Sequence, residues 1–294
     1  MNGVVNVVKP PLITSFKVVE IIKRKFKLRH VGHLGVLDPI ATGLLQIAVG
    51  SATKLFEYFT GLERSYRAEL LLGISTDTQD AAGRPIKISE DVDISNLEEI
   101  IDSFTGEITQ IPPMYSSLHY KGKRLYELAR DGIEVPRTPR NVLIKHIDII
   151  DIKKDRYPRI ILDVVCQRGT YIRTLCHDIG EKLGVGAHML SLVRTRIGNI
   201  DLSQAYSLTE ILGRGNSIAE YFMPWGMLSE IEKIDLIVKK QRDDFIKGKP
   251  ILLYKTYYSR REFVSVWYNN ECIGVGRCFQ DVLYPIAVEN LNVS

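Results

Sequence analysis

Alternation of hydrophobic and polar residues predicts strands in several parts of the chain. Tyr66, Ala68, Leu70 and Leu72 fall on one side of such a stretch, with Arg67 and Glu69 between them. This period of two is typical of a half-buried strand. Further strand-like runs lie at 4–8, 44–49, 142–152 and 160–167.

Helical spacing appears between these runs. Ser15 is a candidate N-cap for a helix that carries Val18, Val19, Ile22 and Phe26 on one face. Other helices are expected at about 52–59, 97–104, 123–130 and from Gly169-Thr170 to Leu183. Because strands and helices mix without a regular strand–helix–strand repeat, the pattern favours an α+β fold.

The pattern changes after Pro224. A short helix at about 239–246 precedes Gly248, and strand-like runs follow at 263–267, 271–276 and 283–287. We expect a catalytic domain over 1–228 and a small β-barrel-like domain over 229–294, within the usual size range of domains.

Composition describes an ordinary globular chain. Of 294 residues, 45% are hydrophobic and 25% are charged. No apolar run is long enough for a membrane span, and the N-terminus lacks the layout of a secretory signal, so we expect a cytoplasmic protein. Cys166, Cys176, Cys272 and Cys278 form no Cys-x-x-Cys pair and are expected to be free thiols.

Charge is segregated along the chain, although the net charge is only +4. Segment 21–33 holds five basic residues and no acidic residue, and segment 119–145 holds seven basic against three acidic residues. Segment 88–107 holds seven acidic residues and no basic residue. A solvated helix face explains any single run best. Two basic runs on either side of a candidate catalytic stretch favour an RNA partner.

That candidate stretch runs from Gly32 to Gly43 and contains one carboxylate, Asp38. Pro39 biases Asp38 toward an extended conformation, and the glycines permit tight turns. A rigid loop before a buried strand suits a catalytic side chain. An Asp-Pro turn that caps a helix remains the alternative.

The order of residues in this stretch resembles the G-H-x-G-x-L-D-P-x-A-T-G signature of the bacterial tRNA pseudouridine-55 synthases, the TruB family. The resemblance continues in register through Ala52-Thr53-Lys54, Tyr66-Arg67-Ala68, Thr76-Asp77-Thr78, Asp80–Gly83, Pro112–Leu118, Gly122-Lys123 and Gly169–Arg173. One departure is Leu12, which stands where the family has glycine.

The resemblance implies a mixed, mainly antiparallel sheet and the isomerisation of one tRNA uridine at position 55 of the T-loop after base flipping. It gives Asp38 the role of the catalytic carboxylate, Arg173 that of the arginine beside it, and Tyr66 that of a tyrosine stacked on the uracil. Isomerisation adds no atoms, and the chain has no nucleotide- or dinucleotide-binding motif, so no cofactor is expected. A solvated helix residue and a core tyrosine are the alternatives for Arg173 and Tyr66.

The resemblance also implies contacts with the tRNA. His33, Tyr171, Leu192 and Lys9 are expected to contact the substrate, although Leu192 could equally be a core residue. Segment 119–145, with Lys121, Lys123 and Arg124, is a candidate flap ordered by RNA. The C-terminal module resembles a PUA domain, which would touch the acceptor stem through Lys249, Arg260 or Arg261.

Three other functions were weighed. An RNA-folding chaperone is compatible with base flipping and would survive loss of the Asp38 carboxylate. A glycoside hydrolase would need two carboxylates, and the 32–43 loop has one. A subunit of a guide-RNA-directed pseudouridylation particle has the same fold, but the chain lacks long lysine-rich tails. The six histidines include no His-x-x-x-His pair, so no metal is expected, and the protein is expected to act as a monomer.

Overall fold

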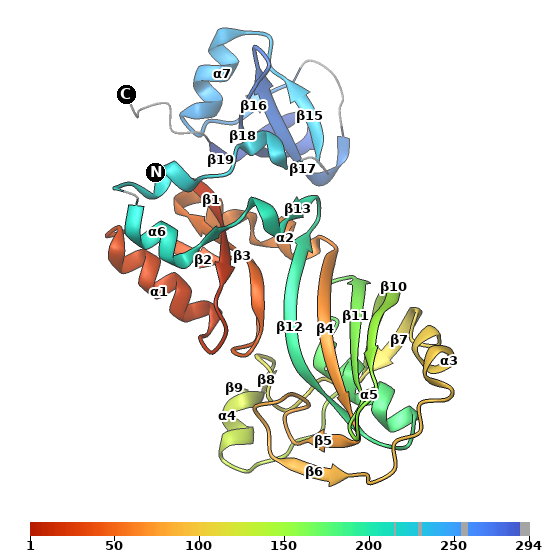
Figure 1. Cartoon of the computed structure of the whole chain (residues 1–294). Coiled ribbons are helices and arrows are strands. Elements are labelled where there is room, and N and C mark those ends of the chain that lie inside the picture. Colours follow the sequence, from red (N-terminus) through yellow and green to blue (C-terminus); the bar gives the residue numbers. More distant parts are fainter. Residues whose placement is uncertain (215, 229–230, 254–257, 289–294) are drawn as a thin grey trace. The chain divides into compact units, whose positions relative to one another are not determined.

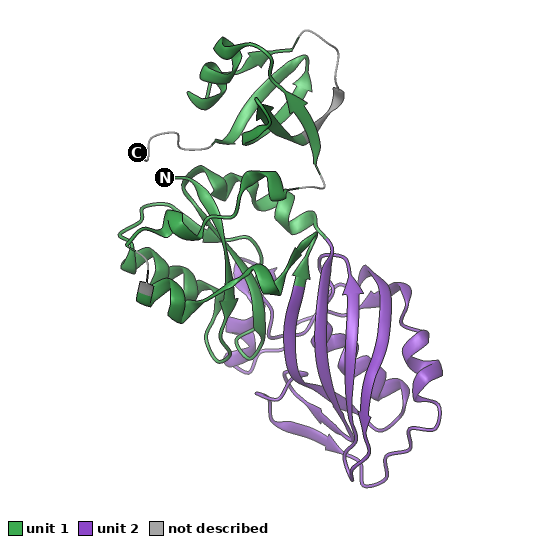
Figure 2. Cartoon of the chain, turned by 45° about the horizontal axis from the view of Figure 1, so that its top comes forward, with its two compact units in different colours: residues 1–62, 196–294 green, residues 63–195 purple. Residues whose placement is uncertain are grey.

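A computed structural model describes residues 1–214, 216–228, 231–253 and 258–288; the side chains of 214 and 258–262 also lie outside the description. The chain forms two compact units, one of residues 1–62 and 196–294 and the other of residues 63–195 (Figure 2). Each unit is described by itself.

The first part of unit 1 is a small mixed sheet. β1 (Gly3–Lys9) pairs antiparallel with β3 (Thr42–Val49), which pairs antiparallel with β2 (Val31–His33). β14 (Tyr206–Ser207) adds a parallel strand on the other side of β1. Around it lie α1 (Ser15–Lys25), η1 (Gly50–Leu55), α2 (Phe56–Gly61), β13 (Ile200–Asp201), η2 (Leu202–Gln204), α6 (Leu208–Arg214), η3 (Ile218–Tyr221) and η4 (Trp225–Met227).

The start of α1 differs from the prediction by one residue. Thr14, not Ser15, is the N-cap, and its side chain accepts a hydrogen bond from the Lys17 amide at 3.0 Å. Ser15 is buried and its hydroxyl is used elsewhere, so it cannot cap the helix. Val18, Val19 and Ile22 form the buried face, as their spacing predicts.

The C-terminal part of unit 1 is a curled five-stranded sheet in the order β15 (Glu232–Asp235), β17 (Tyr258–Tyr268), β18 (Glu271–Gln280), β19 (Val282–Val288) and β16 (Ile251–Leu252) (Figure 1). α7 (Lys239–Ile246) buries Phe245 in its core with Val264, Val266 and Ile273. The small β-barrel-like module expected at this end of the chain is confirmed.

Unit 2 is built on five long strands in the order β12 (Ala187–Ile197), β4 (Arg64–Leu72), β11 (Arg159–Cys166), β10 (Arg140–Lys153) and β7 (Gly106–Gln110). β4, β11, β10 and β7 pair antiparallel in succession. The alternate residues of β4 are buried, as predicted for Tyr66 to Leu72. The rest comprises β5 (Ile74–Thr76), β6 (Pro85–Ile88), α3 (Leu97–Asp102), β8 (His119–Tyr120), β9 (Lys123–Arg124), α4 (Leu125–Arg130) and α5 (Ile172–Lys182). An α+β fold with a mixed, mainly antiparallel sheet is therefore confirmed.

Four predicted helices have different bounds. The helix predicted at 97–104 ends at Asp102. The region 52–59 is divided between η1 and α2. The helix predicted at 123–130 begins at Leu125, because Lys123 and Arg124 pair with β8 in a hairpin. α5 begins at Ile172, because the Thr170 hydroxyl donates back to the Gln167 carbonyl at 2.9 Å and does not cap the helix.

All four cysteines are free thiols, as expected. In the described part of the chain no helix is long and apolar enough to cross a membrane.

Candidate active site

The loop that carries Asp38 lies between β2 and β3 in unit 1 and is braced from the β1–α1 connection. The buried Ser15 hydroxyl accepts from the Leu37 amide at 2.9 Å and lies 3.1 Å from the Leu37 carbonyl, to which it donates. The Ala41 amide donates to the Asp38 carbonyl at 3.1 Å, which closes a turn around Pro39. Asp38 is half-buried. These bonds fix the backbone on both sides of the carboxylate.

Lys9 supplies a second brace. Its side chain is fully buried, and its ammonium donates to the carbonyls of Pro10 at 2.8 Å, Ile13 at 2.7 Å and Pro39 at 3.1 Å. An ammonium has three donors, and these carbonyls accept from all three. The contacts of Lys9 therefore hold the Asp38 loop to the β1–α1 connection, and a contact between Lys9 and substrate stays a prediction.

Leu12 forms the third link to this loop. Its amide donates to the Pro39 carbonyl at 2.8 Å, and its φ is 67°, in the left-handed region. This conformation costs a residue with a side chain about 1–2 kcal/mol and suits glycine. The departure of Leu12 from the family glycine thus falls on a position where the backbone itself favours glycine.

Arg173 lies in the first turn of α5 in unit 2, as expected. It is 4% exposed, and its guanidinium donates to the carbonyls of Tyr115 at 2.9 Å and Thr78 at 3.2 Å. It also forms an ion pair with Asp80 at 3.5 Å. The predicted alternative of a solvated helix residue is therefore wrong, because Arg173 is buried and bonded within the unit.

Asp80 is an element of this site that the sequence argument quoted only as part of a matching motif. Its Oδ1 accepts from the Thr78 hydroxyl at 2.7 Å and the Ala82 amide at 3.0 Å, and its Oδ2 faces Arg173. Asp80 is 4% exposed. A buried carboxylate needs this number of partners, so Asp80 and Arg173 position each other.

Tyr66 lies in the middle of β4 and is 8% exposed. Burial raises the pKa of its phenol, while the positive charge and hydrogen bond of Arg194 on β12 act in the opposite direction. The phenol is therefore neutral at neutral pH and supplies a ring face and a hydroxyl, not a free base.

The other expected substrate contacts are distributed between the two units. In unit 1, His33 ends β2 and pairs with Ile47 of β3. In unit 2, Tyr171 is the N-cap of α5, where its backbone amide and carbonyl bond to the buried Gln110 side chain at 3.0 and 3.2 Å. Leu192 is 5% exposed on β12. Their roles toward a substrate stay predictions.

The three residues of segment 119–145 that are expected to contact RNA lie on one hairpin. Lys121, at the turn between β8 and β9, has its ammonium 5.5 Å from the centre of the Tyr120 ring. Lys123 is exposed, and the Arg124 guanidinium donates to the Ser117 carbonyl at 2.5 Å. The hairpin thus presents two cations to solvent, while Arg124 braces it.

The expected contacts of the C-terminal module are only partly described. Lys249 is exposed after α7 and pairs with Asp244 at 3.5 Å. Arg260 and Arg261 lie on β17, and their side chains lie outside the described residues.

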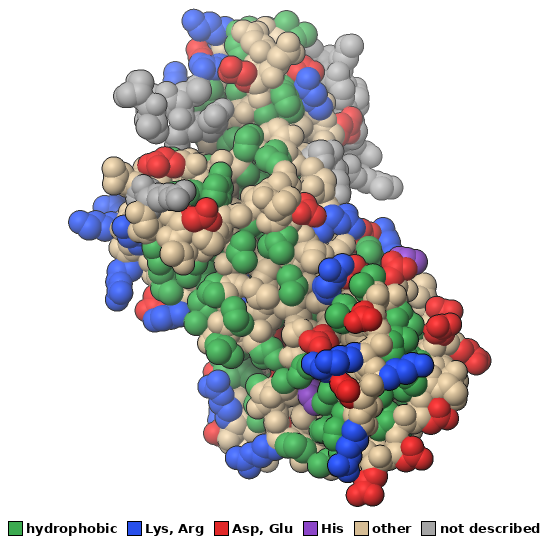
Figure 3. All heavy atoms as spheres, viewed as in Figure 1, with side chains coloured by type: hydrophobic (Ala, Val, Ile, Leu, Met, Phe, Trp, Pro, Cys, Tyr) green, Lys and Arg blue, Asp and Glu red, His purple; other side chains and the backbone are tan. Residues whose placement is uncertain are grey.

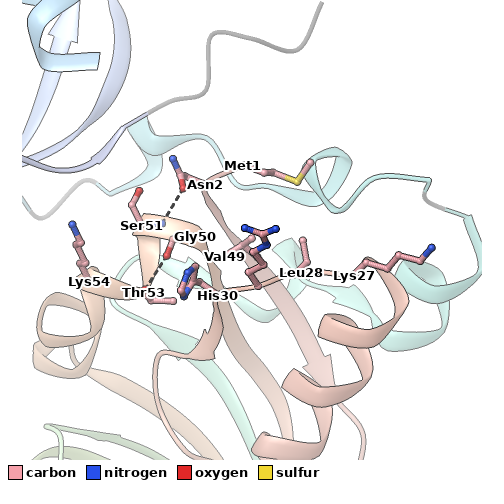
Figure 4. A pocket seen from close by; sticks show the side chains of 11 residues that line it. Met1, Asn2, Lys27, Leu28, His30, Val49, Gly50, Ser51, Thr53 and Lys54 are labelled. Atoms are coloured by element: carbon pink, nitrogen blue, oxygen red, sulfur yellow. Dashed lines mark hydrogen bonds between the residues drawn. The ribbon is translucent and has the colours of Figure 1, made fainter. Parts of the chain in front are cut away.

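A basic pocket in unit 1 adds residues that were not singled out for binding. It has a volume of about 530 Å³. Figure 4 shows two hydrogen bonds among the lining residues, from the Ser51 amide to the Asn2 side chain and from the Thr53 hydroxyl to the Gly50 carbonyl. Its basic side chains come from the segment after α1 and from η1; they are the cations Lys27, Arg29 and Lys54, with the imidazole of His30. The match at Ala52-Thr53-Lys54 was the available signal for Lys54.

Charge elsewhere follows the predicted segregation. Acidic side chains gather over the part of unit 2 that contains α3, whose first turn holds Glu98 and Glu99 (Figure 3).

The described residues hold no group of three or more His, Cys, Asp or Glu side chains that could bind a metal ion.

Comparisons with known proteins show the family of the chain. Residues 23–172 match the family model "TruB family pseudouridylate synthase (N terminal domain)", and residues 173–222 match "tRNA pseudouridylate synthase B C-terminal domain". A tRNA pseudouridine synthase B of Moorella thermoacetica is 49% identical over 72% of this chain and 70% of that protein. A tRNA pseudouridine synthase B of Clostridium tetani is 46% identical over 80% of this chain and 81% of its own length. One of Heliobacterium mobile is 40% identical over 94% of this chain and 90% of its own length.

Among solved structures, a Cbf5–Nop10–Gar1 complex contains a chain that is similar with a TM-score of 0.69 and 24% identity, over 98% of this chain and 84% of that one. At this identity the likeness concerns the fold alone. The family models and the curated relatives of higher identity show the family as well: the chain belongs to the TruB family of pseudouridylate synthases.

Proposed function

We propose that this protein converts one uridine of tRNA to pseudouridine, at position 55 in the T-loop, with Asp38 as the catalytic carboxylate. The observation that carries the proposal is the Asp38 loop. Lys9, Leu12 and Ser15 all bond to residues next to Asp38. A catalytic side chain must be held near its productive geometry, and three residues of the β1–α1 connection hold this loop.

The reaction breaks the N1–C1′ bond, turns the uracil and joins C5 to C1′. The proton on C5 leaves and N1 gains a proton, so the atoms balance without a co-reactant. A carboxylate can attack the sugar or the base, or stabilise positive charge that develops on the sugar. Asp38 takes this role.

Arg173 and Tyr66 complete the catalytic set in this proposal. A guanidinium keeps a neighbouring carboxylate ionised and oriented, and the three contacts of Arg173, to Asp80, Thr78 and Tyr115, leave it little freedom to move. The ring of Tyr66 stacks on the uracil. Its neutral phenol makes stacking the main role, with proton removal from C5 dependent on the charge of Arg194.

Two basic surfaces serve the RNA backbone. The pocket of Lys27, Arg29, His30 and Lys54 binds phosphates in unit 1, and the hairpin with Lys121 and Lys123 does so in unit 2. His33 contacts the T-loop where the base leaves the stack, and Tyr171 and Leu192 line the base pocket. Flipping costs a few kcal/mol, which such contacts offset.

The proposal includes the organisation of the chain. Residues 1–228 form the catalytic domain, with 119–145 as a flap ordered by RNA, and 229–294 form a PUA-like domain that touches the acceptor stem through Lys249, Arg260 or Arg261. The protein acts as a cytoplasmic monomer. Limited proteolysis with and without tRNA tests the flap, since protection of 119–145 by tRNA is expected and unchanged cleavage contradicts it.

Release of tritium from C5-labelled uridine tests the activity itself. A T-stem-loop RNA labelled throughout its uridines should release the label of one uridine and no more. The matched control is the same RNA with cytidine in place of the target uridine, which should release none. No release from the first RNA, or equal release from both, contradicts the proposal.

A further inference from the structure

Three large hydrophobic side chains on the β1–α1 connection, at the start of α1 and on the Asp38 loop are exposed to solvent. Leu12 is 84% exposed, Phe16 is 69% exposed and Val36 is 55% exposed. We call these three residues the apolar patch. Hydrophobic side chains are exposed at the end of unit 1 where the loops before α1 and before β3 turn (Figures 1 and 3).

The members of the apolar patch converge on one loop. The Leu12 amide bonds to the carbonyl of Pro39, next to Asp38. Phe16 directly follows Ser15, whose hydroxyl bonds both to the amide and to the carbonyl of Leu37. Val36 directly precedes Leu37. Each exposed side chain is therefore within two residues of a bond to the loop that carries the catalytic carboxylate.

The stability of the fold does not explain why a leucine occupies position 12. Its φ of 67° costs free energy for any residue with a side chain, and its 84% exposure returns almost none through burial. Backbone strain without a packing benefit is found mainly at functional sites. Phe16 lies in the first turn of α1, where a polar residue would be expected on the exposed face.

The charge of α1 indicates the occupant of the apolar patch. α1 carries Lys17, Lys23, Arg24 and Lys25 against one acidic residue, Glu20, which pairs with Lys17 at 2.9 Å; Lys23, Arg24 and Lys25 lie in its last turn. An exposed aromatic ring on a helix with an excess of cations suits unpaired nucleotides, because a base stacks on the ring while phosphates of the same strand meet the cations. A protein partner would not require this excess of positive charge.

We propose that the apolar patch binds unpaired bases of the substrate RNA that neighbour the target uridine, with Phe16 as the stacking platform and Leu12 and Val36 as its apolar border. This inference rests on the proposed function for the identity of the RNA. It gives the chain a base-binding surface outside the catalytic set, with Leu12 and Phe16 on the segment that holds the Asp38 loop and Val36 on that loop itself.

Binding of a fluorescent T-stem-loop RNA tests the proposal. Stacking on an aromatic ring is lost on substitution by alanine, so Phe16→Ala should weaken binding about 5- to 150-fold. Leu12→Gly should weaken it less, by about 2- to 10-fold, without loss of thermal stability, because glycine accepts the positive φ. Phe56→Ala is the matched control: Phe56 is 49% exposed on the same unit, and its loss should change binding less than 2-fold.

Abasic RNA separates stacking from other effects. In wild type, removal of one loop base beside the target should weaken binding as much as Phe16→Ala does. In Phe16→Ala, the same abasic RNA should bind as well as the intact RNA. The proposal would be overturned if Phe16→Ala binds the intact RNA as tightly as wild type does, or if removal of the loop base lowers the RNA affinity of both proteins equally. Tritium release by wild type is measured in parallel: if it occurs while the Phe16 test fails, this inference falls and the proposed function stands.

Discussion

Substitution of Asp80 by asparagine tests whether the buried ion pair positions Arg173. The change removes one negative charge and keeps the shape of the side chain. The remaining Oδ1 can still accept from the Thr78 hydroxyl and the Ala82 amide, at 2.7 and 3.0 Å in the native structure. The amide group that replaces Oδ2 then faces Arg173, and two donors oppose each other.

The magnitude follows from burial and from the bonds that survive. Removal of one partner from a buried ion pair costs about 3–5 kcal/mol, because the other charge stays buried. Arg173 keeps the carbonyls of Tyr115 and Thr78, and its distance to Asp80 is 3.5 Å, longer than a strong ion pair. We therefore expect the free energy of unfolding to fall by about 2–3 kcal/mol, at or just below the lower end of that range. A guanidinium displaced by about 1 Å should slow the chemical step by about 100-fold.

Chemical denaturation and single-turnover tritium release measure the two effects. Asp77→Asn is the matched control, because Asp77 is an exposed carboxylate in the same turn whose Oδ1 accepts from the Arg84 amide, a bond that asparagine keeps. It should change stability by less than about 0.5 kcal/mol. If Asp80→Asn behaves like Asp77→Asn in both assays, the pair does not hold Arg173 and the reasoning is wrong.

Three further predictions concern other parts of the chain. Lys54→Glu should weaken RNA binding and lower the slope of log affinity against log salt by about one unit. The control, Lys154→Glu at an exposed position, should do neither. Equal salt slopes for the two variants would exclude the pocket from RNA binding. Leu12→Gly should raise the free energy of unfolding by about 0.5–1 kcal/mol, because relief of the left-handed backbone strain outweighs the greater conformational entropy that glycine gives the unfolded chain. A loss of stability would contradict the strain at position 12. Burial, with a smaller effect from the charge of Glu181, raises the pKa of the Asp178 carboxyl to about 6. The folded state therefore favours the protonated carboxyl, and the stability that this carboxyl contributes is present below about pH 4 and is lost as pH rises through 6. Asp178→Asn should therefore become more stable relative to wild type between pH 4 and 7 in urea melts, and a constant difference across that range would contradict this.

Much of the fold follows from local sequence patterns. The period of two at Tyr66 to Leu72 and the bounds of α7 at Lys239–Ile246 agree with the predictions, because burial of one face decides both. The bounds that differ do so where tertiary contacts compete with local preference. Ser15 is a good cap by type, but its hydroxyl bonds to Leu37, 22 positions away.

The site shows the same limit. Asp38 was recognisable from the order of residues around it, whereas the burial of Lys9 under three carbonyls was not, since a lysine after a strand is usually solvated. Asp80 gave no sign of its partner, because Arg173 lies 93 positions further along the chain. Pairing over such a distance depends on the finished fold.

The central claim is that the carboxylate of Asp38 performs the chemistry. Its most direct test is tritium release by Asp38→Asn under single-turnover conditions, with T-stem-loop binding measured on the same preparation. The account predicts that the variant binds the RNA within about threefold of wild type, since Asn is nearly isosteric, and releases no label above background. Release at the rate of wild type would contradict it.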